Sequence, residues 1–157
     1  MKYNSKKSYT VEEALTKLQK YCSYQDRCHK EVEQKLKEMR MIPQAADQII
    51  MALIQGNYLN EERFTMAFVR GKFKIKKWGK RRLKSELKQR NISNYLLCKS
   101  LNQIKDEEYN ATFEALANRK AASLNGTLPI KKKKLADYLL YRGWESQKVY
   151  DKVNKLF

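Results

Sequence analysis

Apolar residues recur in this chain with one spacing that appears three times. The steps between them are 4, 5, 5, 4 and 3 residues in every copy, and the copies start 51 and then 52 residues apart. Steps of 3 and 4 mark one face of a helix, and two successive steps of 5 bracket a turn, so each copy predicts a helix, a short turn and a second helix. The three sets are Val32, Leu36, Met41, Ala46, Ile50 and Leu53; Leu83, Leu87, Ile92, Leu97, Leu101 and Ile104; and Leu135, Leu139, Trp144, Val149, Val153 and Leu156.

The residues at the predicted turns support this interpretation. Asn91 and Gly143 precede the central apolar residue of the second and third copies, and both tolerate the left-handed conformation that ends many helices. Arg40 stands in the same place in the first copy, so we expect that helix end to be less well defined. Ser93 and Ser146 are expected to cap the second helices of the second and third copies, and Pro43 suits an early position in the second helix of the first copy.

A further helix is predicted before each pair, so the repeating unit has three helices. Each opens with acidic residues that suit the positive end of the helix dipole, and Thr10 with Glu13 forms a capping box. The sequence predicts an all-α, elongated tandem array of three helix-turn-helix-like modules, at residues 1–60, 61–105 and 106–157. Lys72–Lys76 alternates like a strand but is too short to outweigh the helical pattern. The acidic pairs are Glu12 and Glu13, Glu61 and Glu62, and Glu107 and Glu108.

Cysteine usage and hydropathy indicate the cellular compartment in which the protein works. Cys22, Cys28 and Cys98 form no C-x-x-C pair, and an odd number of thiols is a poor disulfide framework, so we expect reduced cysteines. Cys22 and Cys28 with His29 could bind a metal, but packed thiols explain them more simply. No apolar run approaches the roughly 20 residues of a membrane span, and no signal peptide is recognisable. A soluble, cytoplasmic protein without membrane contact is expected.

Catalytic motifs are missing from the sequence. It has one histidine and five glycines, with no phosphate-binding glycine loop. His29 has no nucleophile or orienting acid in its sequence context. Asp106, Glu107 and Glu108 could form an acid–base or metal site, but their place at a helix start has a simpler electrostatic explanation. We therefore expect a protein that binds rather than catalyses, with no catalytic residue, metal or cofactor.

Positive charge is concentrated in the middle of the chain. Of a formal net charge of +17, ten charges fall between residues 70 and 90, where eleven basic residues face one acidic residue. Lys80, Lys84 and Lys88 recur at a spacing of four, so they share one helix face while Leu83 and Leu87 point inward. A second basic cluster begins a helix of the third module. The candidate partner-binding residues are Arg70, Lys72, Lys74, Lys76, Lys77, Lys80, Arg81, Arg82, Lys84, Lys88, Lys131, Lys132, Lys133 and Lys134.

A solvated helix face would explain any one of these residues, but the dense cluster costs self-repulsion that a polyanion or an acidic protein groove would relieve. Phe73 and Trp78 interleave with the lysines, and Trp78 fits a core anchor better than a base-stacking platform. Because exposed charges contribute little to stability, reversing four of them is expected to change thermal unfolding little. These four are Lys77, Lys80, Arg81 and Lys84.

Three segments of the middle module form a specific motif. They are residues 57–64 (NYLNEERF), 67–70 (AFVR) and 77–87 (KWGKRRLKSEL), and residues 24–27 (YQDR), 32–36 and 139–144 (LLYRGW) extend the pattern to the outer modules. From about Thr10 to Phe157 the chain resembles the RecX family of bacterial recombinase regulators. Cys28 and Arg40 depart locally from the residues usual in that family.

The resemblance implies a curved row of three-helix modules that binds the RecA recombinase filament along its helical groove. Binding would inhibit the recombinase and ATPase activities of RecA and so modulate recombination and DNA repair. The implied partners are the RecA filament and, through the basic surface, single- or double-stranded DNA, with the protein acting as a monomer. Only the basic run of the middle module is carried over as a contact surface.

The alternative is a DNA-binding protein that uses its helix pairs as helix-turn-helix modules. The second helix of each pair would then enter a major groove. That helix offers only Lys99 as a basic residue in module two, and Lys148, Lys152 and Lys155 in module three. DNA binding is therefore expected to be unspecific, through phosphate contacts. A small nuclease is a more distant alternative, because the acidic clusters show no convergent metal-ligand pattern.

Overall fold

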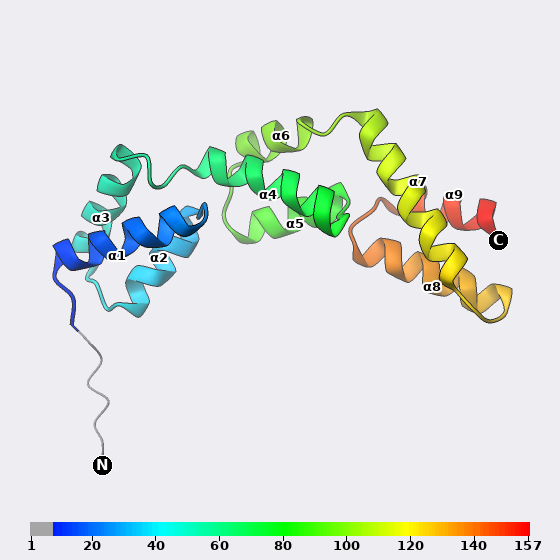
Figure 1. Cartoon of the computed structure of the whole chain (residues 1–157), viewed down its shortest axis with the longest axis horizontal. Helices are drawn as coiled ribbons and strands as arrows, with labels where there is room; N and C mark the ends of the chain where they lie inside the picture. The colour runs from blue at the N-terminus through cyan, green and yellow to red at the C-terminus, as the bar shows by residue number, and fades with distance from the viewer. Residues whose placement is uncertain (1–7) are drawn as a thin grey trace, which may run out of the picture. The chain divides into compact units, whose positions relative to one another are not determined.

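The computed structural model describes residues 8–157, and every regular element within that range is an α-helix. The all-α prediction is confirmed for this part of the chain, and Lys72–Lys76 belongs to a helix. The helices are α1 (Val11–Tyr24), α2 (His29–Glu38), α3 (Pro43–Gln55), α4 (Glu61–Lys76), α5 (Lys80–Gln89), α6 (Asn94–Asn102), α7 (Asp106–Ser123), α8 (Leu128–Tyr141) and α9 (Ser146–Leu156) (Figure 1).

The helices pack as two compact units, and the boundary between them lies within α4. Unit 1 ends at Thr65, and unit 2 runs Met66–Phe157. Among the residues that the structure describes, three helices fall within each of the predicted ranges 1–60, 61–105 and 106–157. The division into three modules stays a prediction, since the last five helices all belong to unit 2.

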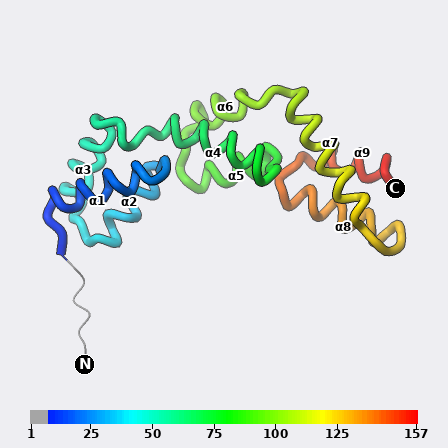
Figure 2. The backbone as a smooth tube through the Cα atoms, in the orientation of Figure 1, coloured from blue at the N-terminus to red at the C-terminus, as the bar shows by residue number. Residues whose placement is uncertain are grey.

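In unit 1, α3 packs against both α1 and α2 (Figure 2). The apolar spacing places Ala46 and Ile50 in the core, but they are half-buried, whereas Ala45 and Ile49 are buried. The buried stripe of α3 is therefore shifted by one residue, because this helix faces two neighbours. The buried core of the unit contains Ala14, Leu18, Cys22, Val32, Leu36, Met39, Ile49, Leu53 and Leu59.

In unit 2 the apolar spacing agrees closely with the observed burial. All six residues of the second copy and the first five of the third are buried, while Leu156 is half-buried. The three equivalent residues Leu36, Leu87 and Leu139 are each 0% exposed, as the repeat predicts. The aromatic core of the unit centres on Trp144, whose ring centroid lies 4.6 Å from that of Tyr109, 5.2 Å from that of Phe113 and 6.5 Å from that of Phe73.

The three predicted turns share one conformation. Asn91 and Gly143 have φ angles of 58° and 88°, which confirms the predicted left-handed helix ends. Arg40 has a φ of 59°, so the expectation of a less defined end was wrong. In that turn the Met41 amide donates to the Leu36 carbonyl at 3.1 Å, and the corresponding bond in the second copy has the same length. This bond closes the turn whether the left-handed residue is arginine, asparagine or glycine.

Two of the three residues predicted at the starts of these helices have the predicted role. Pro43 is the first residue of α3, and the Ser93 hydroxyl caps α6 by accepting a hydrogen bond from the Leu96 amide at 3.3 Å. The prediction for Ser146 was wrong, because Glu145 holds the cap position of α9. The Ser146 hydroxyl instead accepts a hydrogen bond from Arg81, a residue remote in sequence.

Candidate partner-binding surface

The basic stretch of unit 2 turns between α4 and α5, and this turn is bonded to the one between α8 and α9. Lys77 adopts a left-handed φ of 58°, and its carbonyl accepts a hydrogen bond from Trp144 Nε1 at 3.1 Å. The Gly79 amide donates to the Arg142 carbonyl at 2.8 Å, and the Arg81 amide donates to the Gly143 carbonyl at 3.0 Å. These bonds fix the start of α5 against the end of α8.

Two glycines allow the backbones to approach this closely. A Cβ atom at Gly79 would lie 2.5 Å from the Gly143 carbonyl oxygen. A Cβ atom at Gly143 would lie 2.3 Å from the Arg82 amide nitrogen, at a φ of 88° that already favours glycine. Any larger residue would push the two turns apart.

A buried tyrosine joins the same two turns. The Tyr109 hydroxyl accepts a hydrogen bond from the Lys80 amide at 3.0 Å and donates to the Glu145 carboxylate at 2.8 Å. Burial raises the pKa of Tyr109 well above its ordinary value, so the hydroxyl remains a donor at neutral pH. Sequence reasoning missed this residue, although its spacing of four from Phe113 marks it as part of the buried face of α7.

The arginines of α5 and Arg90, the residue that follows this helix, bond to groups of unit 2 itself. Arg81 donates to the Ser146 hydroxyl at 2.8 Å, and Arg82 donates to the Tyr141 carbonyl at 3.3 Å. Arg90 pairs with Glu86 at 3.0 Å. Their side chains therefore help to hold the fold.

Lys80 also departs from the predicted pattern. It is half-buried, with its Nζ 4.8 Å from the centre of the Tyr109 ring. The expectation that Lys77, Lys80, Arg81 and Lys84 are all exposed was wrong for Lys80, which is half-buried on a ring, whereas Arg81 is exposed but bonded to Ser146. Reversing these four charges together would therefore disturb the start of α5.

The lysines farther along α4 and α5 face solvent. No ion pair joins them to any other residue in the range that the structure describes. Arg70 on α4 is also exposed. Lys72 is half-buried instead, with its Nζ 5.2 Å from the centre of the Trp78 ring. Trp78 is half-buried and Phe73 is buried, so Phe73 is a core residue. The exposed lysines are Lys74, Lys76, Lys77, Lys84 and Lys88.

Two shallow hollows run along α5. One has a volume of about 550 Å³ and the other about 590 Å³, and they share Arg81 and Ser85, so we describe them together as the α5 groove. Lysines line one end of this groove, and Tyr141 lines the other. The remaining lining residues are Arg82, Lys84, Glu86, Lys88, Gln89, Leu140, Gly143 and Ser146.

The second basic cluster lies elsewhere in unit 2. Lys131, Lys132, Lys133 and Lys134 occupy the first two turns of α8, whereas the α5 groove meets the other end of that helix at Tyr141. Seven residues of helix rise separate Lys134 from Tyr141, which is about 10 Å. Lys133 pairs with Asp137 at 3.1 Å. None of the four lysines of this second cluster lines the α5 groove.

The lysines of α9 are directed at α7. Lys148 donates a hydrogen bond to Asn110, and Lys152 pairs with Glu114. The side chain of Lys152 is only 12% exposed. Two of the three basic residues that α9 would need for a DNA groove are therefore bound within the protein.

The candidate metal and acid residues are engaged in local contacts. Cys28 is buried and donates to Glu31 at 3.3 Å, and burial raises the pKa of its thiol to about 11. His29 Nδ1 lies 3.9 Å from Glu61. All three cysteines are free thiols, and among residues 8–157 no three histidine, cysteine or acidic side chains converge as metal ligands. The acidic triplet Asp106–Glu108 lies exposed in the first turn of α7.

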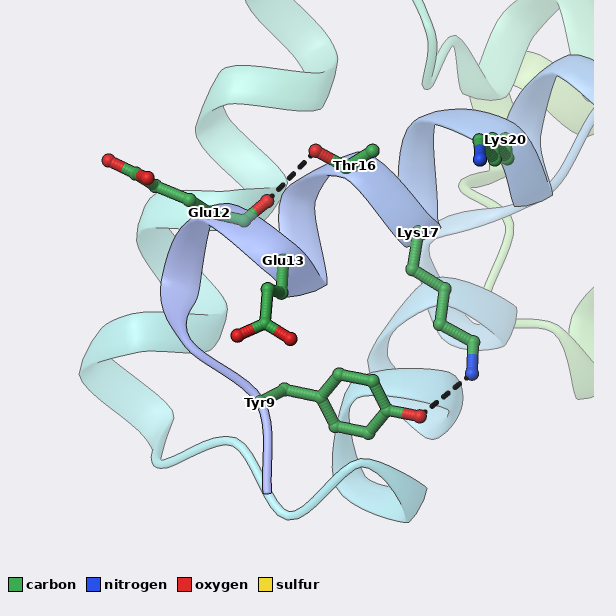
Figure 3. A pocket seen from close by; sticks show the side chains of 6 residues that line it. All are labelled: Tyr9, Glu12, Glu13, Thr16, Lys17 and Lys20. Atoms are coloured by element: carbon green, nitrogen blue, oxygen red, sulfur yellow. Dashed lines mark hydrogen bonds between the residues drawn. The ribbon is translucent and has the colours of Figure 1, made fainter. Parts of the chain in front are cut away.

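A hollow beside α1 is lined by six residues, and the bonds drawn there join neighbouring side chains and backbone of the same segment (Figure 3). Its volume is about 480 Å³. Lys17 donates to the Tyr9 hydroxyl at 2.9 Å, and the Thr16 hydroxyl donates to the Glu12 carbonyl at 3.0 Å. Lys17, Tyr9 and Thr16 are thus bonded within this one segment of the chain. Within residues 8–157, no helix combines the length and the apolar character needed to cross a bilayer.

Known proteins match both the sequence and the fold. The family model for the second three-helix domain of RecX matches residues 60–101. The regulatory protein RecX of Lactobacillus johnsonii is 34% identical over 104 residues, which cover 66% of this chain and 38% of that protein. The regulatory protein RecX of Listeria welshimeri is 25% identical over 144 residues, which cover 90% of this chain and 53% of that protein. The chain thus spans about half the length, or less, of these relatives.

The fold comparison agrees with the sequence comparison. A crystal structure of a regulatory protein RecX superposes with a TM-score of 0.80 at 20% identity, over 92% of this chain and 73% of that one. The fold and the basic groove define an all-helical protein of the three-helix-domain class. The chain belongs to the RecX family of regulatory proteins, as the sequence motifs predicted.

Proposed function

We propose that this protein is a negative regulator of the RecA recombinase. It binds the RecA–DNA filament and inhibits its recombinase and ATPase activities, and in this way it modulates recombination and DNA repair. Membership of the RecX family supports this role, since the matched relatives are named regulatory proteins. It acts as a monomer in the cytoplasm, without a cofactor and without catalysis of its own.

The observation that carries the proposal is the charge of unit 2. This unit has 23 basic and 8 acidic residues, a net charge of +15. Its exposed lysines repel one another, and an assembly rich in negative charge relieves that repulsion. A nucleoprotein filament is such an assembly. The helix-turn-helix alternative is less well supported, because α9 directs Lys148 and Lys152 at α7.

The test measures binding and inhibition with variants that change charge and spare the fold. Lys84→Glu with Lys88→Glu reverses two exposed charges on α5, and Lys20→Glu with Lys37→Glu reverses two exposed charges in unit 1 as a matched control. Wild-type protein should co-sediment with ATP-bound RecA filaments and slow their ATPase. The α5 variant should need at least about tenfold more protein for the same inhibition, because complementary charges guide association.

The control variant should inhibit like the wild type. If the α5 variant inhibited RecA at the same concentration as the wild type, the α5 surface would not be part of the contact with the filament. Absence of any effect of wild-type protein on the RecA ATPase would reject the proposed function itself.

A further inference from the structure

The short loop between α7 and α8 contains the one Asn-Gly pair of the sequence, at Asn125 and Gly126 (Figure 1). Both residues are exposed, and Gly126 has a φ of 119°, in the region that favours glycine. Among the residues that the structure describes, none is hydrogen-bonded to the Gly126 amide or to the Asn125 side chain. The loop therefore leaves a backbone nitrogen and the neighbouring side-chain amide free to react with each other.

An asparagine followed by glycine cyclises without an enzyme. The glycine nitrogen attacks the carbonyl carbon of the asparagine side chain, a C–N bond forms, and the bond from that carbon to the NH2 group breaks. The NH2 group takes up the proton that the glycine nitrogen loses to solvent, and it departs as ammonia. Water then adds across either C–N bond of the cyclic imide and leaves an aspartate or an isoaspartate. Glycine favours the first step, because no Cβ atom hinders the attacking nitrogen.

Asn91 is the best comparison within the same unit, because it is also exposed, with a left-handed φ of 58°. The residue after it is Ile92, whose amide donates to the Leu87 carbonyl at 3.1 Å. That nitrogen is already engaged in a hydrogen bond, and the β-branched side chain of Ile92 crowds it. Exposure alone therefore does not set Asn125 apart, whereas the free amide of the next residue does.

The start of α8 adds an electrostatic reason. The first turn of this helix contains no acidic residue, and lysines occupy residues 131–134. The positive end of the helix dipole begins at Leu128, two residues after Gly126. The reaction passes through a negative charge on the glycine nitrogen and ends with a carboxylate. Positive charge nearby favours both of these species.

We propose that Asn125 is a modification site, at which the chain converts its own asparagine to aspartate and isoaspartate. The product places a carboxylate in front of α8 and lowers the positive charge around residues 131–134. A Cβ atom built on Gly126 would lie 3.3 Å from Ile130 Cγ2, so the loop packs closely on α8. Isoaspartate lengthens the backbone by one carbon at this contact and changes its shape. The reaction needs neither RecA nor DNA, so it goes beyond the proposed function.

The test incubates the purified full chain at mildly alkaline pH and follows its tryptic peptides by mass spectrometry. Cleavage releases residues 121–131, which contain Asn125, and residues 91–99, which contain Asn91. Exchange of NH2 for OH raises the peptide mass, and a sample digested without incubation gives the background. The 121–131 peptide should convert many-fold faster than the 91–99 peptide, and more slowly at mildly acidic pH, because the attacking nitrogen must lose its proton. Asn125→Gln keeps the amide but would have to close a larger ring, so it should stay unmodified.

A comparison with the unfolded chain tests the contribution of the fold. The native chain should modify Asn125 at least as fast as the chain unfolded in guanidinium chloride, because the positive start of α8 exists only in the folded state. Slower conversion in the native chain would show that the fold protects this asparagine and would overturn the proposal. Equal conversion of the 121–131 and 91–99 peptides would also overturn it.

The effect of the product is tested with Asn125→Asp. This variant should melt at a higher temperature than the wild type, since it places an anion at the positive end of α8. Asn91→Asp makes the same change of charge just beyond the other end of a helix, α5, and should not raise the melting temperature. A melting temperature of Asn125→Asp no higher than that of Asn91→Asp would overturn the proposed effect of the new carboxylate on α8.

Discussion

The two units of this protein use charge in different ways. Unit 1 has 11 basic and 9 acidic residues, a net charge of +2, whereas unit 2 has a net charge of +15. In unit 1 opposite charges meet: Arg63 pairs with Asp26 at 2.7 Å, and Arg27 with Glu31 at 3.7 Å. Unit 2 also has such pairs, for example Arg90 with Glu86 at 3.0 Å, but its 23 basic residues outnumber its 8 acidic residues, so most of its cations have no acidic residue of their own to pair with.

This difference shows which charges serve the fold. Arg63 bonds to Asp26 and to the carbonyls of Asn57 and Tyr58, so it connects α4 to the loops of unit 1. Lys84 and Lys88 have exposed side chains on a helix whose buried face is already complete. Neither lysine packs into the core, which fits the contact surface proposed above.

The largest effect is expected where unit 2 depends on close backbone contact. Gly143→Ala would place a Cβ atom 2.3 Å from the Arg82 amide nitrogen at a φ of 88°. Because the atom it meets belongs to the backbone, we expect a loss of about 3 kcal/mol or more in the stability of unit 2. Hydrogen exchange followed by residue should show faster opening of α5 and α8, with unit 1 unchanged.

Gly71 provides the matched control for this prediction. A Cβ atom there meets nothing within 4 Å, and the residue lies inside α4. Gly71→Ala should stabilise the protein by about 0.5–1 kcal/mol, since alanine favours a helix. If Gly143→Ala behaved like Gly71→Ala, the close contact between the two turns would not exist in solution.

A smaller effect is expected from the buried Tyr109 hydroxyl, which joins the turn before α5 to the turn before α9 in unit 2. Tyr109→Phe leaves the Lys80 amide and the Glu145 carboxylate without their shared partner. We expect a loss of about 1–3 kcal/mol in the free energy of unfolding, measured by denaturant titration. Tyr95→Phe, at an exposed ring, should be neutral. Equal stability of both variants would mean that the junction does not depend on this hydroxyl.

The same tyrosine predicts a pH dependence. Burial raises the folded-state pKa of Tyr109 above its usual value near 10.0. The folded state therefore keeps a proton that the unfolded chain loses first. Its contribution to stability is complete below pH 10 and is lost as the pH rises beyond that value. The loss above pH 10 should be smaller in Tyr109→Phe than in the wild type, as measured by thermal unfolding from pH 9 upward.

Some of these features could be predicted from the sequence because they depend on near neighbours. Asn91 and Ser93 act within one turn of their own helices, and the apolar spacing records which face each helix buries. The site depends on contacts between remote residues: Tyr109 meets Lys80 and Glu145 across 29 and 36 positions. Ser146 was assigned to a cap, but Arg81, 65 residues away, binds its hydroxyl. Local propensity contains no information about such partners.

The smallest effect is expected in unit 1, with the opposite sign to Gly143→Ala. Arg40 holds the equivalent left-handed position with a φ of 59°, and its side chain is exposed, so little packing would be lost. Arg40→Gly relieves the strain of a Cβ atom in that conformation and keeps the bond from the Met41 amide to the Leu36 carbonyl. We expect a gain of about 0.5–1 kcal/mol, seen as a rise of a few degrees in the melting temperature of unit 1. Lys20→Gly, at an exposed position in the interior of α1, should instead lose about 1 kcal/mol, since glycine disfavours a helix interior. If both glycine variants lost stability equally, the left-handed turn of unit 1 would not form as it does in unit 2.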